Sequence, residues 1–179
     1  MAGIVKVWDP VVRVFHWGLV LSFAVAWLSA DQSKTLHHWA GYAAGALIAL
    51  RLVWGLLGTR YARFSQFVHH PSKVLGYLRD IVTGKESRYL GHNPAGGAMI
   101  VALILTMGSL AFTGWLSQTD QFFGVGWVED GHKLLAKLLL VLVVVHIGGV
   151  VLASLRHREN LPWAMITGWK RETGPEDIA

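Results

Sequence analysis

Four long apolar stretches constrain the fold of this chain more than any other feature. They cover residues of about 11–30, 37–57, 95–116 and 133–155. Each is close to the roughly 20 residues that a helix needs to cross the ~30 Å hydrocarbon core of a bilayer. With 53% hydrophobic and only 15% charged residues, the chain is also more apolar than an ordinary soluble domain. We therefore expect one all-α domain over residues 1–179, folded as a transmembrane four-helix bundle.

The distribution of positive charge predicts how this bundle is oriented. All of the 16 Lys and Arg residues except Lys34, Lys133 and Lys137 lie before the first stretch, at the end of the second, between the second and third, or after the fourth. Because cytoplasmic segments of membrane proteins are enriched in Lys and Arg, both termini and the central loop should be cytoplasmic. Enrichment of Lys and Arg on the cytoplasmic side thus accounts for the net charge of +5. Because this charge does not indicate a surface for nucleic acid, we expect no nucleic-acid partner.

The first stretch has an alternative interpretation, a cleaved signal peptide, because Lys6 and Arg13 precede an apolar run that ends in Leu28-Ser29-Ala30. However, the run is longer than the apolar part of a signal peptide and carries a Trp near each end, as interfacial anchors do. Asp9-Pro10 also suits a helix start, with Asp as the N-cap and Pro at the first helical position. We expect the stretch to be retained as a span.

Two further segments lie outside the apolar stretches. Between the second and third, residues of about 73–83 carry one apolar helical face that consists of Val74, Leu75, Leu78, Ile81 and Val82. We expect a helix on the cytoplasmic surface, either among the lipid headgroups or against a partner subunit. From about residue 170 the chain is polar, and we expect a frayed tail over 172–179.

Four histidines recur at depths that suit two metal centres. His132 and His146 lie fourteen residues apart, so they point within about 40° of each other and are about 21 Å apart along a helix. With the orientation above, His16 and His146 fall in the inner half of the membrane, and His37 and His132 lie at its outer side. Ionisable residues in a bilayer are costly, so four in two matched layers favour a functional role.

Each pair can supply both axial imidazoles of one haem iron, which leaves no open position and suits electron transfer. We predict that His16 and His146 bind an inner haem and that His37 and His132 bind an outer haem. Both would be non-covalent haem b, since the chain has no Cys for covalent attachment. His38 is the alternative to His37, from which it points about 100° away.

Arg51 and two glycines accompany the predicted ligands. Arg51 follows His37 by fourteen residues and so shares its face, about 21 Å further inward. There its guanidinium can neutralise the propionates of the inner haem; snorkelling to the headgroups is the alternative. Gly41 and Gly45 follow at helical spacings and leave room for a flat porphyrin, although small residues also serve helix packing in lipid.

The other histidines and two methionines have expected roles outside ligation. We expect solvated or interfacial rings at four cytoplasmic loop or helix-end positions: His69, His70, His92 and His157. Of these, His92 is a candidate for proton exchange with a quinone. Met99 and Met107 can in principle be axial ligands, but core packing is the favoured interpretation.

These residues belong to a set of motifs that extends along nearly the whole chain. The motifs are Trp8-Asp9-Pro10 with Arg13 and Phe15-His16-Trp17; His37-His38-Trp39-Ala40-Gly41-Tyr42 with Leu50-Arg51-Leu52-Val53-Trp54-Gly55; Gly91-His92-Asn93-Pro94-Ala95-Gly96; Thr113-Gly114; His132 through His146; and Glu159-Asn160-Leu161 with Met165-Ile166-Thr167-Gly168. This set resembles the prokaryotic cytochrome b561 family, which includes the b-type cytochrome subunit of nickel–iron hydrogenases. The resemblance implies a four-helix cytochrome with two haems in the bacterial inner membrane, with the four predicted ligands on the family's haem-ligand positions.

We expect an electron-transfer subunit rather than a self-contained enzyme. It would pass electrons between the quinone pool and a c-type cytochrome, or a dehydrogenase or hydrogenase subunit. One alternative, which the resemblance allows, is oxidation of superoxide at the outer surface with reduction of quinone, where Lys34, Lys133 and Lys137 would attract the anion. Another is a proton-coupled transporter with histidine relays, which would be colourless. The sequence leaves the oligomeric state open, a homodimer included.

Overall fold

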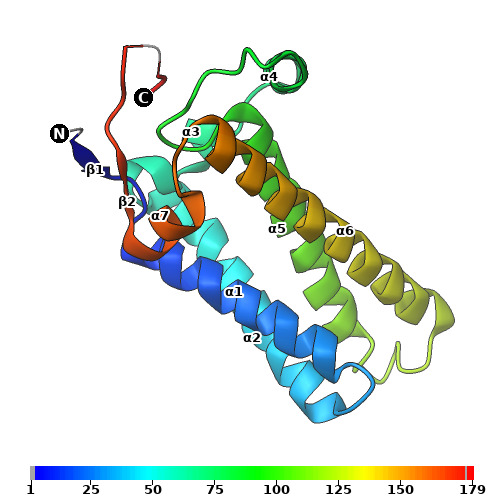
Figure 1. The fold of residues 1–179 in the computed structure, drawn as a ribbon. Coiled ribbons are helices and arrows are strands. Elements are labelled where there is room, and N and C mark those ends of the chain that lie inside the picture. The colour runs from blue at the N-terminus through cyan, green and yellow to red at the C-terminus, as the bar shows by residue number, and fades with distance from the viewer. Residues whose placement is uncertain (1–2, 176) are drawn as a thin grey trace. The chain divides into compact units, whose positions relative to one another are not determined.

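The computed structural model describes residues 3–175 and 177–179 and is mostly helical (Figure 1). In chain order, its elements are β1 (Ile4–Lys6), α1 (Pro10–Ser29), α2 (Lys34–Leu57), η1 (Arg60–Ala62), α3 (Phe64–Phe67), α4 (Pro71–Thr83), α5 (Pro94–Leu116), α6 (Gly126–Arg156), α7 (Leu161–Thr167) and β2 (Trp169–Arg171).

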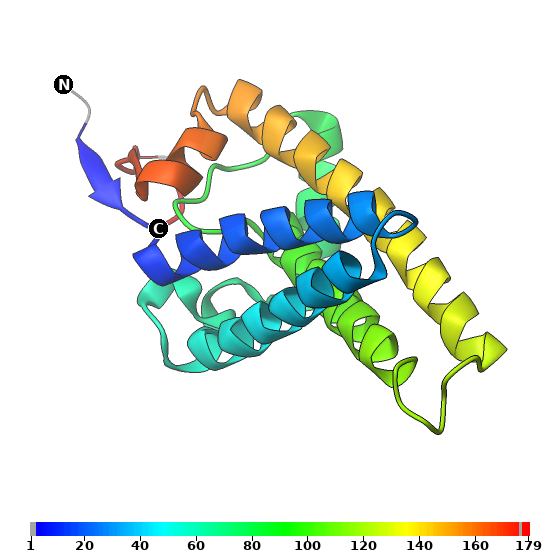
Figure 2. The same cartoon turned by 90° about the horizontal axis from the view of Figure 1, so that it is seen from below.

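Four helices, α1, α2, α5 and α6, are long and apolar enough to cross a membrane, with mean hydropathies between 1.6 and 2.8. They coincide with the four apolar stretches expected to span a membrane, and α1 begins at Pro10 as the Asp9-Pro10 motif predicts. The turn between α1 and α2 is short, and the two helices run back antiparallel to each other in both views (Figures 1 and 2). One boundary differs: α6 begins at Gly126, ahead of the expected Lys133. The acidic Glu129 in its first turn favours this extension, because negative charge stabilises a helix N-terminus.

The chain forms two compact units. The terminal unit comprises Met1–Arg13, Trp54–Val101 and Val144–Ala179, and the middle unit comprises Val14–Val53 and Ala102–Val143. Each of the four long helices contributes residues to both units, and the short elements α3, α4, α7, β1 and β2 all belong to the terminal unit.

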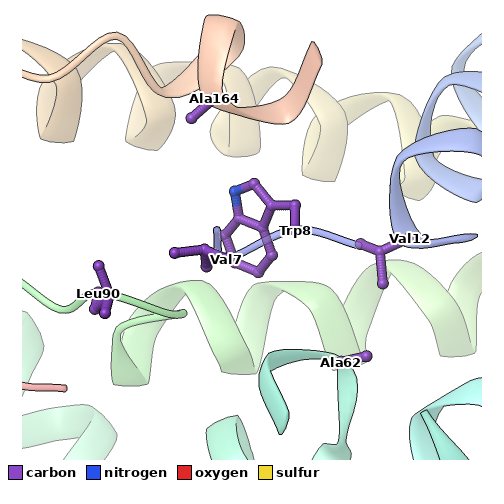
Figure 3. Packing of buried hydrophobic residues seen from close by; sticks show 6 residues of the cluster. All are labelled: Val7, Trp8, Val12, Ala62, Leu90 and Ala164. Atoms are coloured by element: carbon purple, nitrogen blue, oxygen red, sulfur yellow. The ribbon is translucent and has the colours of Figure 1, made fainter. Parts of the chain in front are cut away.

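The terminal unit is built around Trp8. In β1 and β2, which pair antiparallel, Ile4 lies opposite Arg171 and Lys6 opposite Trp169. Beyond the strands, the backbone N–H groups of Val7 and Trp8 both donate to the carbonyl of Gly168, at 2.9 and 3.1 Å. Figure 3 shows the indole of Trp8 among apolar side chains from several segments; the buried cluster consists of Val7, Trp8, Val12, Ala62, Leu90 and Ala164. Burial of this cluster therefore joins the two end segments of the chain.

Asp9 joins the start of α1 to the end of α2. One carboxylate oxygen, Oδ1, accepts from the backbone N–H of Val12 at 2.9 Å, which confirms the predicted N-cap. The other, Oδ2, accepts from the Trp54 Nε1–H at 3.1 Å and the Thr59 hydroxyl at 2.6 Å. Burial raises the pKa of the Asp9 carboxyl, but these hydrogen bonds to its charged form outweigh burial and hold the pKa below its ordinary value.

The expectation of a frayed tail is wrong for the described residues; Glu176 lies outside them. Arg88, only 4% exposed, donates to Glu159 at 2.8 Å and also pairs with Asp177. The buried ammonium of Lys170 lies 3.2 Å from Glu159. Buried cations require anionic partners. Here Glu159 serves both Arg88 and Lys170, and Asp177 serves Arg88. The local polarity of the tail did not reveal this requirement, because the opposing charges are distant in sequence.

Candidate functional site

Two of the predicted ligands face each other in the middle unit. His37 lies near the start of α2 and His132 near the start of α6, and their ring centres are 6.1 Å apart with the ring planes inclined at 75°. An imidazole nitrogen binds a metal at about 2 Å. A metal held between two such nitrogens, each ~1 Å from its ring centre, would separate the centres by about 6 Å. The observed spacing therefore fits one metal ion between the two rings.

Hydrogen bonds to the protein select which nitrogen of each ring can bind. The Nδ1 atom of His37 lies 2.8 Å from the carbonyl oxygen of Ala26. Because a carbonyl can only accept, this nitrogen carries the hydrogen, and the lone pair resides on Nε2. A ligating histidine usually donates its other ring N–H in this way.

His132 has an equivalent partner on α5. Its Nδ1 atom lies 3.1 Å from the hydroxyl oxygen of Thr113, and that hydroxyl directs its own hydrogen to the carbonyls of Ser109 and Leu110, at 2.9 and 3.1 Å. The Thr113 oxygen therefore accepts from His132, and the lone pair of this ring is also on Nε2. The sequence did not predict this contact, because Thr113-Gly114 stood out only as a motif with no assigned role. The partner of His37 could not be predicted either, because a backbone carbonyl such as that of Ala26 is independent of the side chain.

Both rings line a cavity in the middle unit. Its volume is about 170 Å³, and it opens at the surface of the unit. The lining is mainly apolar or aromatic and consists of Ser22, Phe23, Ala26, His37, His38, Gly41, Tyr42, Ala44, Met107, Leu110, Ala111, Gly114, Trp115, Ser117 and His132. Apolar walls with a few placed polar groups are typical of cofactor sites.

The two glycines of α2 have different surroundings. A Cβ atom added at Gly41 would meet nothing within 4 Å and would occupy space along the cavity. At Gly45 the added atom would lie 3.4 Å from the Cβ of Ala111, an ordinary contact between packed helices. Gly41 thus leaves room for a flat group, as expected, whereas Gly45 serves the packing of α2 on α5.

The donor set and the cavity fit a haem. The ring centres of His37 and His132 have the spacing expected of two ligands of one metal, and Gly41 lines the same cavity without a side chain. His38 also lines the cavity, with its ring centre 6.1 Å from that of His37, but His37 is the ring that lies opposite His132. Met107 is buried and lines the same cavity, which agrees with packing as its role.

Arg51 is buried rather than directed to the headgroups. Its side chain belongs to the middle unit, the residue is 3% exposed, and the guanidinium carbon lies 5.9 Å from the ring centre of Phe15. This burial removes the snorkelling alternative. A contact with haem propionates stays a prediction.

The other predicted pair is divided between the units. His16 is half-buried in the middle unit, where its ring meets Trp17 edge-on at 5.0 Å. His146 is half-buried in the terminal unit. The pairing of these two residues stays a prediction.

Of the remaining histidines, His92 differs from the expected solvated or interfacial rings, whereas His70 is exposed at a helix end as expected. The His92 ring is packed against Trp8 at 4.5 Å and Phe67 at 4.8 Å, within the terminal unit. His70 is exposed but serves as the N-cap of α4, where its Nδ1 accepts from the backbone N–H of Ser72 at 3.4 Å. Both roles depend on neighbours that loop polarity does not specify.

Comparison with known proteins adds one match. A family model described as prokaryotic cytochrome b561 matches residues 7–168, which include all four predicted ligands, Arg51 and Thr113. No curated protein and no solved structure matches the chain.

Proposed function

Because this chain belongs to the prokaryotic cytochrome b561 family of membrane b-type cytochromes that transfer electrons, we propose that it binds two haems b. We further propose that it passes electrons between membrane quinone and a partner redox protein. The observation that carries the proposal is the arrangement of His37 and His132, whose rings line one cavity with their centres 6.1 Å apart.

In the outer site, His37 and His132 would bind the iron from opposite sides. The haem supplies one-electron chemistry by alternating between ferric and ferrous iron. With both imidazoles as its ligands, the iron would have no free position for oxygen or substrate, which would favour electron transfer. The apolar lining limits access of water, and the acceptors of Ala26 and Thr113 hold the two rings in orientation.

For the inner site we propose His16 and His146 as ligands and Arg51 as the cation beside the propionates. Support comes from the sequence spacing, since fourteen residues of continuous helix between His132 and His146 rise about 21 Å. The burial of Arg51 also supports it, because its guanidinium is held inside the unit, where it could bind the carboxylates of a haem by charge-assisted hydrogen bonds. Two haems in series would conduct electrons between the membrane faces.

We place the protein in the bacterial inner membrane with both termini in the cytoplasm, as the distribution of Lys and Arg favours. The proposed electron partners are quinone or quinol on one side. On the other they are a c-type cytochrome, or a dehydrogenase or hydrogenase subunit. The family match supports a membrane cytochrome, and the chemistry of bis-histidine haems supports electron exchange without bound substrate.

The test is a haem count on single-histidine variants. Purified after haem-replete expression, the wild-type chain should carry two haems b. The variants His37→Ala and His132→Ala should each lose one, and their combination should lose no more. The variants His16→Ala and His146→Ala should lose the other, and His38→Ala should keep both. A wild-type chain with less than one haem per two molecules, or full haem content in His132→Ala, would overturn the proposal.

A second candidate is oxidation of superoxide with reduction of quinone. It is favoured by the exposed side chains of Lys34, Lys133 and Lys137, which lie in the same unit as the outer site and can attract an anion. Lys133 is 68% exposed and has Asp130 3.9 Å away, so its charge is only partly balanced. Reduction of the haems by superoxide no faster than by a neutral reductant of similar potential would exclude this function.

A further inference from the structure

Helix α5 contains no histidine, yet two of its residues contact the ring of His132. Thr113 accepts from Nδ1, and Gly114 lies against the adjacent edge of the ring. We propose that Thr113-Gly114 is the positioning element of the outer haem: it orients His132 and lowers the reduction potential of the iron that this ring would bind. The inference rests on the proposed function, because it requires a haem between His37 and His132.

The Thr113 hydroxyl acts through the charge of the imidazole. An acceptor on Nδ1–H draws the hydrogen away from the ring and raises the basicity of Nε2. A more basic ligand donates more electron density to iron and stabilises the ferric state over the ferrous state, so the potential falls. The hydroxyl is held as an acceptor because its hydrogen is directed to the carbonyls of Ser109 and Leu110.

Gly114 acts by leaving room for the ring of His132. A Cβ atom at this position would lie 3.1 Å from Cε1 of His132 and 3.5 Å from Nδ1, closer to Cε1 than side-chain carbons normally approach. The ring would have to move away from α5, and the 3.1 Å hydrogen bond to Thr113 would lengthen. Gly108, on the same helix, provides a contrast, since an added Cβ would meet its nearest atom, Cγ2 of Ile48, at an ordinary 3.6 Å.

The two proposed ligands of this site differ in whether a side-chain substitution can change the hydrogen bonds of their rings. His37 donates to the backbone carbonyl of Ala26, which a change of side chain does not remove. His132 has the Thr113 hydroxyl as a partner, which a single substitution removes, and the backbone carbonyl of Leu110 as a further acceptor that remains. Side-chain chemistry from α5, a span that supplies no ligand, therefore adjusts the potential of the outer haem.

The first experiment measures midpoint potentials of the purified protein with its haems. Thr113→Val keeps the shape of the side chain and removes the acceptor. We expect both haems to be retained and one potential to rise by about 59 mV, which corresponds to a tenfold change in the preference for ferrous over ferric iron. Thr113→Ser keeps the acceptor and should retain the wild-type potential. Thr106→Val makes the same change at a buried threonine of the same helix that does not line the cavity, and should shift neither potential.

The second experiment tests the position of the ring. Gly114→Ala should change the ferric electron paramagnetic resonance signal of one haem, because this signal responds to the angle between the axial imidazoles, 75° here. Gly108→Ala should leave the signal unchanged. Identical signals for Gly114→Ala and wild type would overturn the proposed role of Gly114.

The outcomes separate this inference from the proposed function. If His132→Ala retains two haems, the proposed function itself fails. If His132→Ala loses one haem but Thr113→Val moves no potential relative to Thr106→Val, only the positioning role is overturned. If Thr113→Val loses a haem, the Thr113→Ser variant gives the answer. Two haems at the wild-type potentials in Thr113→Ser support the role of the hydroxyl. Loss of a haem or a shifted potential in Thr113→Ser contradicts that role.

Discussion

In the terminal unit, buried charges meet opposite charges of the same chain, whereas in the middle unit two imidazole nitrogens face a cavity. Arg88 and Lys170 are each about as buried as a core residue, and both pair with Glu159. His37 and His132 each direct Nδ1 to a protein acceptor, and both rings line the cavity. The terminal unit thus pairs these buried charges internally, while in the proposed function the two histidines of the middle unit bind a group from outside the chain.

This difference indicates how the two units depend on haem. A unit whose buried charges are already paired and packed around Trp8 can keep its structure without a cofactor. A unit with a cavity of about 170 Å³ forgoes packing contacts until that space is filled. We expect the middle unit to gain more protection than the terminal unit when haem binds, and the predictions below test this contrast.

The largest expected effect is the removal of Arg88. Arg88→Ala would leave Glu159 and Asp177 without their shared cation in a buried setting. Loss of one partner from a buried ion pair costs about 3–5 kcal/mol, so the free energy of unfolding in detergent should fall by about this amount. The exposed Arg79 gives the control, since Arg79→Ala should change stability by less than about 0.5 kcal/mol. Equal stabilities of the two variants would contradict the assignment of Arg88.

A smaller but site-specific effect should follow from adding bulk at two open glycines, one in each unit. A Cβ at either Gly41 or Gly76 meets nothing within 4 Å, but only Gly41 lines the cavity. Gly41→Leu should therefore compete with haem and reduce the haem content by about half, the share of one site of two, while Gly76→Leu should retain full content. The ratio of haem absorbance to protein absorbance measures both. Full haem content in Gly41→Leu would show that the cavity is not the haem site.

Acid should weaken the terminal unit through its paired carboxyl groups. Burial raises the pKa values of Glu159 and Asp177, but hydrogen bonds and ion pairs, those from Arg88 among them, outweigh burial and hold both values below the ordinary 4.5 and 3.8. A carboxyl group with a lowered pKa contributes stability above its ordinary pKa and loses it as the pH falls through the lowered value. The protection factors of the β2 amides against hydrogen exchange should therefore fall below about pH 4, with Asp9 adding in the same direction.

The control for this pH effect is Arg88→Met. This variant lacks the cation that helps to keep Glu159 and Asp177 charged. The protection of its β2 amides should therefore depend less on pH below the ordinary carboxyl pKa values. An unchanged pH dependence would show that other groups carry the acid sensitivity.

The smallest effect concerns the cap of α7. The side-chain oxygen of Asn160 accepts from the backbone N–H of Trp163 at 2.9 Å. Asn160→Ala should lower the stability of the terminal unit by about 1 kcal/mol, and Asn160→Asp should restore most of it, because both Asn and Asp are good N-cap residues. Haem content should be unchanged in both. A loss of haem would mean that α7 supports the cofactor site as well as the terminal unit.

Much of the fold follows from hydropathy and charge patterns. The four spans were predictable because each requires about twenty apolar residues in succession, and Asp9-Pro10 marked the start of α1 correctly. The extension of α6 to Gly126 was missed because residues with charge were assigned to the loop, although acidic residues suit a helix start. The ordered part of the tail was missed because its partner, Arg88, is distant in sequence.

The sequence by itself determined the number of spans, the absence of covalent haem attachment and the set of candidate ligands, because these depend on composition and on helical spacing. Only the tertiary structure placed His37 opposite His132, directed their Nδ1 atoms to Ala26 and Thr113, and separated the role of Gly41 from that of Gly45. The physical reason is that periodicity fixes the face on which a residue lies. Hydrogen bonds and free space depend on which neighbouring helix meets that face.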